Sequence, residues 1–156
     1  MTFSLGHPTD RRPPFKFSSY TRVGFSDTDA QGIVYYGRYL PYFDHARVEY
    51  ARQLGLLAYD LGECEFVMRA SQVVYEAPAR FDDLLEVFVR TKRIGRTSVS
   101  SEYAALRVAD NVLMCTAEQT LVLVDLAERR PVPVPNGYRR PIEAFEGADV
   151  EVAVPR

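Results

Sequence analysis

The most regular pattern of apolar and polar positions in the chain is a stripe at helical spacing over Arg38–Leu54. Its apolar members fall at i, i+4, i+7, i+11 and i+15 and therefore share one face: Tyr39, Phe43, Ala46, Tyr50 and Leu54. Pro41 lies in the first turn, where its missing N–H is tolerated, and Gly55 follows as the expected C-terminal cap. The pattern predicts one amphipathic helix, roughly 25 Å long at about 1.5 Å per residue, with its apolar face buried.

Five other segments show the composition or the alternation that is typical of β-strands. They are Phe15–Phe25, Phe66–Ala77, Leu84–Ile94, Thr97–Ala109 and Val112–Asp125. Gly95 and Asp110–Asn111 mark tight turns between the last three, so these strands are expected to form an antiparallel meander. Strands of roughly 35–45 Å, at about 3.3 Å per residue, are longer than the helix. We therefore expect the sheet to curl around the helix and cover its apolar face.

One long helix followed by a meander of strands indicates a single α+β domain. Residues 1–14 hold three prolines and a charged triplet, and we expect them to form a mobile arm. Residues 127–156 hold five prolines and are expected to be rich in loops. These features place the domain at residues 15–140 and a C-terminal tail at residues 141–156.

The composition narrows the possible partners and location. With 156 residues, a formal net charge of −2 and a sequence pI near 5.7, the chain has no electrostatic reason to bind nucleic acid. No apolar run reaches the ~18 residues of a membrane span, and the first residues lack the apolar core of a signal peptide. Cys64 and Cys115 form no CxxC pair and are expected to be reduced thiols. We therefore expect a cytoplasmic protein with no integral membrane association.

The histidine content limits the chemistry. The chain has only His7 and His45, too few for most zinc sites or for a typical Ser-His-Asp arrangement. The glycine-rich signatures of nucleotide-binding loops do not occur in the sequence. We expect neither a metal nor an organic cofactor, and we expect carboxylates to carry any catalysis.

Two such carboxylates, Asp27 and Asp29, lie in the loop between the first strand and the helix. Their spacing imitates a calcium-binding loop, but the twelfth position is Arg38 rather than a bidentate glutamate. Aspartate often caps turns, and this is the role we expect for Asp27. Asp29 could do the same, but Gly32 allows close backbone approach and the following helix offers unpaired N–H groups at its start. A carboxylate facing such donors could activate water or attack while the amides hold a developing oxyanion, so acyl chemistry is a hypothesis for Asp29.

Two stretches carry a longer signature, DTDAQGIVYYGRYLPYFDHAR at residues 27–47 and YEAPARFDDLLE at residues 75–86. They resemble the hot-dog-fold acyl-CoA thioesterases, in particular the 4-hydroxybenzoyl-CoA thioesterase family and its relatives associated with the bacterial Tol–Pal system. The resemblance covers roughly residues 15–140 and is most specific in the first stretch. It implies a long central helix wrapped by a five- or six-stranded antiparallel sheet. It also implies a homodimer with active sites at the interface, which often assembles into a homotetramer.

The resemblance further implies roles for particular residues. Asp29 is expected to act as nucleophile or as general base on water. Tyr36 is not part of the family pattern, but its hydroxyl can still hydrogen-bond the water or the thioester carbonyl, so it is predicted as the second catalytic residue. Backbone amides of the facing subunit near Glu65–Val67 are expected to polarise that carbonyl. The CoA phosphates are expected on basic side chains at Lys92, Arg93 and Arg96, although a plain solvated turn is the alternative there. The predicted substrate-binding residues are Gly32, Ile33, Val34, Tyr35, Phe66, Val67, Arg93 and Arg96.

The chain departs from the Tol–Pal-type pattern at two positions. Tyr36 stands where those relatives often carry histidine, and Phe25 stands where they tend to have tyrosine. A phenol with a usual pKa near 10 cannot be a base at neutral pH, which leaves Asp29 as the main candidate. The sequence favours an acyl-CoA thioesterase over two alternatives, a hot-dog hydratase or dehydratase using His45 and a non-catalytic acyl-CoA-binding protein.

Overall fold

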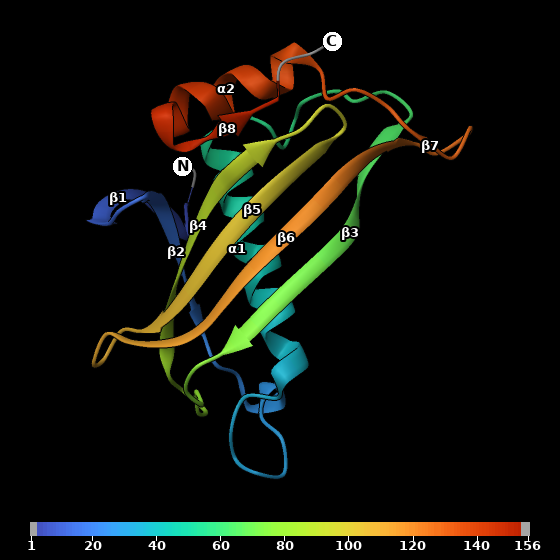
Figure 1. The fold of residues 1–156 in the computed structure, drawn as a ribbon. Coiled ribbons are helices and arrows are strands. Elements are labelled where there is room, and N and C mark those ends of the chain that lie inside the picture. The colour runs from blue at the N-terminus through green and yellow to red at the C-terminus, as the bar shows by residue number, and fades with distance from the viewer. Residues whose placement is uncertain (1–2, 154–156) are drawn as a thin grey trace.

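A single, largely antiparallel sheet wraps the central helix α1 (Tyr39–Gln53), as Figure 1 shows. The computed structural model describes residues 3–153, so residues 1–2 of the predicted arm and 154–156 of the predicted tail lie outside the described part. The main path of the sheet has the order β1-β2-β4-β5-β6-β3, with β7 beside β6 and β8 parallel to β4. The strands are β1 Gly6–Arg12, β2 Phe15–Arg22, β3 Cys64–Tyr75, β4 Leu84–Ile94, β5 Ser98–Arg107, β6 Val112–Asp125, β7 Arg130–Pro131 and β8 Glu151–Val152. The predicted α+β layout is confirmed.

The apolar stripe of α1 packs against the concave face of the sheet. Tyr39, Phe43, Ala46 and Tyr50 are buried as the spacing predicted. The ring of Phe43 lies 4.9 Å, between centroids, from that of Tyr103 on β5. After the helix, Gly55 adopts a positive φ of 72°, and the Leu56 N–H donates to the Ala51 carbonyl at 2.8 Å. The helix therefore ends with the glycine cap that the sequence indicated.

The expectation of a mobile N-terminal arm is wrong for Gly6–Arg12, which form β1 and pair with β2. Pro8, one of the prolines that suggested an arm, is compatible with this position, because an edge strand needs to use only one side of its backbone for hydrogen bonds. Arg11 fixes the strand through an ion pair with buried Glu86 of β4 and lies over the ring of Phe88. The domain therefore begins before residue 15.

The expectation of a loop-rich C-terminal tail is also wrong, because Asn136–Glu146 form the helix α2. Its residues Tyr138, Ile142 and Phe145 recur at i, i+4 and i+7, a helical signal that the surrounding prolines obscured. Pro135 directly precedes the helix in extended conformation, where proline is well tolerated. Within residues 3–153, neither α1 nor α2 is both long and apolar enough to cross a membrane.

Arg139 connects α2 to the rest of the domain. Its buried guanidinium donates to three backbone carbonyls, those of Val134 at 2.9 Å, Gly95 at 2.6 Å and Arg96 at 3.0 Å. Two of these carbonyls belong to the turn between β4 and β5. The helix is thus held over one end of the sheet, at the end opposite to the start of α1 (Figure 1).

Candidate active site

The loop between β2 and α1 is held in shape by Asp27. Its Oδ2 accepts hydrogen bonds from the Gly24 N–H and from the Tyr42 hydroxyl, both at 2.8 Å. Burial of the Tyr42 phenol, together with the nearby Asp27 carboxylate, raises the pKa of Tyr42. Asp27 therefore caps the turn and links it to the helix, which is the structural role expected for it.

Asp29 begins a tight turn that ends at Gly32. Its Oδ1 accepts a hydrogen bond from the Gln31 N–H at 2.8 Å, and its carbonyl accepts one from the Gly32 N–H at 3.0 Å. Gly32 has a φ of 77°, which is accessible mainly to glycine, so the turn requires this residue. The Asp29 N–H bonds the Ile33 carbonyl at 2.9 Å and closes the turn. The backbone thus presents the Asp29 side chain from a hydrogen-bonded turn.

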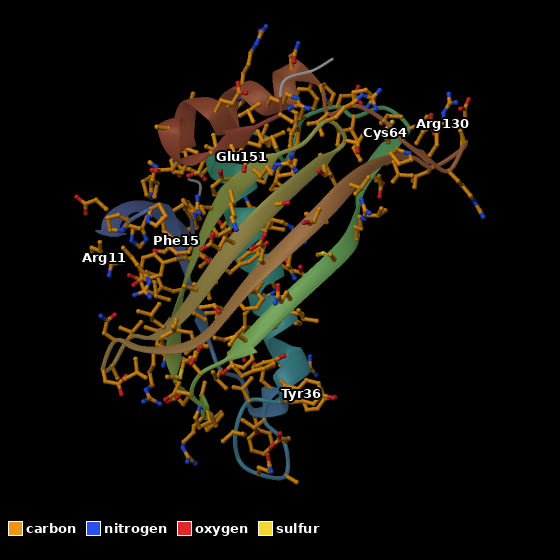
Figure 2. All side chains as sticks on the ribbon, viewed as in Figure 1. Arg11, Phe15, Tyr36, Cys64, Arg130 and Glu151 are labelled. Carbon is orange, nitrogen blue, oxygen red and sulfur yellow. The ribbon has the colours of Figure 1, made fainter. Side chains whose placement is uncertain are left out.

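Asp29 lines a cavity of about 340 Å³, which we call the Asp29 cavity. Its walls come from three segments: the loop before α1, the first residue of α1, and the end of β3 with the three residues that follow it. The lining residues are, in that order, Asp29, Gln31, Ile33, Val34 and Tyr36; Tyr39; and Tyr75, Glu76, Ala77 and Pro78. Figure 2 shows Tyr36 at this end of the molecule, where the Tyr75 hydroxyl donates to the Tyr36 carbonyl at 3.0 Å. The cavity combines aromatic walls with a carboxylate.

The phenols and thiols of this region are poor bases at neutral pH. Burial raises the pKa of Tyr39 to about 12 and also raises that of Tyr75. A hydrogen bond with Tyr36 raises the pKa of Tyr35, whose ring lies 4.4 Å from that of Tyr36. Burial raises the pKa of the Cys115 thiol to about 12, which argues against a thiolate nucleophile there. The carboxylates of Asp29 and Glu76 are the acidic groups in the cavity lining.

The start of the helical run supplies hydrogen-bond donors beside the cavity. Tyr36–Arg38 form a 3₁₀ turn that leads directly into α1. The Arg38 N–H donates to the Tyr35 carbonyl at 2.8 Å. Tyr36 and Gly37 come before it and are the first two residues of the 3₁₀ turn. Groups in these first positions have no earlier helical turn to bond to, and they carry the positive end of the helix dipole. The carboxylate and the helix start are therefore brought together, as the loop sequence suggested.

The structure brings together only part of the predicted site within one chain. Asp29, Ile33, Val34 and Tyr36 line the Asp29 cavity, and Gly32 and Tyr35 belong to the same loop. The stretch Tyr75–Pro78 was recognised in the second motif but was given no role in the site. Its signal was Pro78, just after β3 ends at Tyr75; the next residue, Ala79, contacts the loop through its carbonyl, which accepts the Val34 N–H at 2.8 Å.

The remaining predicted residues lie at the other end of the sheet. Phe66 and Val67 are near the start of β3, roughly 30 Å from Tyr75 at about 3.3 Å per residue. Figure 2 shows Cys64, the first residue of β3, and Tyr36 at opposite ends of the molecule. Arg93 and Arg96 lie at the turn between β4 and β5, where the Arg93 Nε is 3.6 Å from a Glu151 carboxylate oxygen.

Among residues 3–153, no group of three or more His, Cys, Asp or Glu side chains is arranged to hold a metal ion. The Asp27 and Asp29 carboxylates are used instead in separate turns, as their hydrogen bonds to Gly24 and Gln31 show.

Comparisons with known proteins give the family. The model of the thioesterase-like superfamily matches residues 23–152. The acyl-CoA thioesterase YbgC of Haemophilus influenzae is 34% identical over 122 residues, which are 76% of this chain and 88% of that protein.

Solved structures agree with this assignment. A Bartonella henselae protein described as a probable thioesterase is 31% identical and superposes with a TM-score of 0.68 over 76% of this chain and 98% of its own. A thioesterase superfamily protein from Jannaschia sp. shares the fold, with a TM-score of 0.80 and 22% identity over 91% of this chain and 89% of its own. The hot-dog fold is thereby confirmed, and the chain belongs to the thioesterase-like superfamily.

Proposed function

We propose that the protein hydrolyses acyl-CoA thioesters to a free carboxylic acid and CoA, with Asp29 as the reacting carboxylate. The observation that carries the proposal is the position of Asp29 on a cavity that borders the first amides of a buried helix. The proposal is supported by the Haemophilus relative, whose name gives it as an acyl-CoA thioesterase. It requires neither a metal nor an organic cofactor, because CoA is part of the substrate.

Asp29 can take part in thioester hydrolysis in either of two roles. As a general base it takes a proton from water, whose oxygen attacks the thioester carbon before the carbon–sulfur bond breaks. As a nucleophile it forms a mixed anhydride and expels CoA, after which water hydrolyses the anhydride. Both routes consume one water and return a proton to the medium or to the thiolate. In both, the amides that open the helical run at Tyr36 and Gly37 are proposed to hold the oxyanion, and the Tyr36 hydroxyl is proposed to hydrogen-bond the water or carbonyl.

The proposal includes a homodimer formed through β3. In the described part of the chain the main path of the sheet ends at β1 and at β3. The β1 edge carries Pro8 and charged side chains, which discourage pairing with another strand. The β3 edge is 12 residues long and exposes four large apolar side chains: Val67, Met68, Val74 and Tyr75. A long exposed edge of this kind is a template for pairing with a second copy.

Such a dimer unites the predicted site. Two β3 strands related by a two-fold axis run antiparallel, so full overlap places the Cys64 end of one beside the Tyr75 end of the other. Phe66 and Val67 of one subunit then approach the Asp29 cavity of its partner. Arg93 and Arg96 lie at that same end of the sheet and are proposed to contact the CoA phosphates. The family resemblance extends the proposal to a tetramer of two dimers.

The proposal favours hydrolysis over the hydratase alternative. His45, the histidine on which a hydratase would depend, is exposed on α1 and lines a separate groove beside Tyr20 and Thr21 of β2. A cytoplasmic location is part of the proposal and is supported by the two free cysteines, which suit a reducing compartment.

A thiol-release assay tests hydrolysis against binding without catalysis. The purified protein is incubated with acetyl-, hexanoyl-, decanoyl-, benzoyl- and 4-hydroxybenzoyl-CoA, and free CoA is followed with a thiol reagent. The proposal predicts catalytic release from at least one class. No release from any of them, combined with tight CoA binding in calorimetry, would support the non-catalytic alternative instead.

A further inference from the structure

A second cavity, of about 170 Å³, lies at the opposite end of α1 from the Asp29 cavity. We call it the α2 cavity, because Tyr138 and Ile142 of α2 form one of its walls. The other walls come from the second half of α1, with Ala51, and from the concave face of the sheet, with Val99 and Leu121. The two cavities have no lining residue in common.

The lining of the α2 cavity suits an uncharged apolar group. Its one charged member, Arg47, is already held by the Tyr103 hydroxyl at 3.3 Å, the Gln119 Oε1 at 3.1 Å and the Asp44 Oδ1 at 2.9 Å. The hydroxyls of Tyr50 and Thr91 are bonded to each other at 3.0 Å. A ligand in this cavity therefore meets mainly carbon atoms and side chains whose polar groups already have partners.

The α2 cavity lies next to the β3 edge of the sheet. Phe66 of β3 belongs to its lining, and the Phe66 ring packs against Tyr138 with centroids 5.1 Å apart. Exposed Leu57 and Val48 are also part of the lining, so the cavity reaches the surface. Within one chain the cavity is too far from Asp29 to share a small substrate. In the proposed dimer, antiparallel β3 strands bring it to the Asp29 cavity of the partner subunit.

We infer that the α2 cavity receives the acyl group of the thioester that reacts at the Asp29 cavity of the partner subunit. The inference rests on the proposed function and names its substrate class. An engineered apolar cavity of about 150 Å³ is large enough to bind benzene. The α2 cavity of about 170 Å³ therefore accepts an uncharged acyl group of roughly six carbons or one aromatic ring. Tyr138 and Ile142 close its inner wall and set this limit.

The inference gives a definite pattern of specificity. Each methylene that enters an apolar pocket improves binding about fourfold. Hexanoyl-CoA is therefore expected to exceed propionyl-CoA in kcat/KM by roughly 50-fold. Decanoyl-CoA gains nothing further, because its additional carbons do not fit.

Ala51→Leu tests the inference by filling the cavity from α1, at a helical position that leucine suits well. The matched control is Ala144→Leu, the same exchange on the exposed face of α2. We expect Ala51→Leu to reduce the hexanoyl-to-propionyl preference in kcat/KM by about tenfold or more. The control is expected to keep the wild-type preference. In the opposite direction, Ile142→Ala is expected to move the preference toward octanoyl-CoA.

The outcomes separate the inference from the proposed function. Hydrolysis of acyl-CoAs with a preference that neither Ala51→Leu nor Ile142→Ala alters would overturn the inference and leave the function intact. If wild type hydrolyses none of the thioesters, the function fails, and calorimetry with hexanoyl-CoA and CoA decides the inference. Tighter binding of hexanoyl-CoA than of CoA, lost in Ala51→Leu but kept in Ala144→Leu, supports it. Equal binding of the two ligands to wild type overturns it.

Discussion

Replacing Arg139 by methionine is expected to destabilise the protein by about 3–4 kcal/mol. The methionine keeps an apolar stem but removes the guanidinium that donates to the carbonyls of Val134, Gly95 and Arg96. Hydrogen bonds from a charged donor contribute about 1.5–3 kcal/mol each, so three of them amount to roughly 5–9 kcal/mol. Part of this is offset, because the cation is buried and its Nη1 has no hydrogen-bond partner in the described structure. The Arg96 carbonyl also keeps its bond from the Val134 N–H at 2.9 Å.

Urea denaturation measures this loss as a lower midpoint at unchanged slope. A loss of that size corresponds to a fall in Tm of about 10 °C for a domain of this length. The control is Arg140→Met, the neighbouring exposed arginine, for which we expect a change within about 0.5 kcal/mol. If the two variants unfold at the same urea concentration, Arg139 does not anchor α2 and the reasoning is refuted.

Three further predictions follow from the site and its supports. Met68→Arg on the exposed β3 edge is expected to give monomers in sedimentation velocity and to abolish turnover, whereas Thr9→Arg on the β1 edge is expected to leave the dimer intact. An active monomer would contradict an active site built from both subunits. Arg96→Ala is expected to raise KM for acyl-CoA far more than for a short acyl thioester without the nucleotide, and equal effects would mean that Arg96 does not contact CoA. Burial raises the pKa of Glu146 above its usual 4.5, so the folded state holds this proton more tightly and the associated stability is lost as the pH rises through the raised pKa. Glu146→Gln should therefore gain stability relative to wild type as the pH rises above 4.5, and a pH-independent difference in urea midpoints would contradict this.

The sequence predicted the central helix and the meander because their patterns are strong and local. The helical stripe from Tyr39 to Leu54 matches the buried face of α1, and the bounds of β4 and β6 are those predicted. The two ends of the domain were predicted wrongly because proline was taken as evidence against regular structure. Pro8 lies in an edge strand, and Pro135 lies just before a helix, positions that depend on neighbours remote in sequence.

The candidate site was predictable only where its parts are close in the chain. Asp29, Ile33, Val34 and Tyr36 come from one short loop, so the motif contained them all. Tyr39 and Tyr75 entered the site through the packing of β3 beside α1, which no local pattern encodes. The α2 cavity was out of reach for the same reason, since Ala51, Phe66 and Ile142 are brought together by tertiary packing alone.

The central claim, that Asp29 is the reacting carboxylate, is tested most directly by thiol release from Asp29→Asn. Asparagine can still accept the Gln31 N–H bond that shapes the turn, so the exchange removes the base or nucleophile while keeping the loop. The account predicts unchanged urea denaturation and a fall in kcat of about 10²–10⁴-fold on the preferred acyl-CoA, with full activity in the exposed control Asp10→Asn. Turnover by Asp29→Asn within twofold of the control would contradict it and reduce Asp29 to a turn cap.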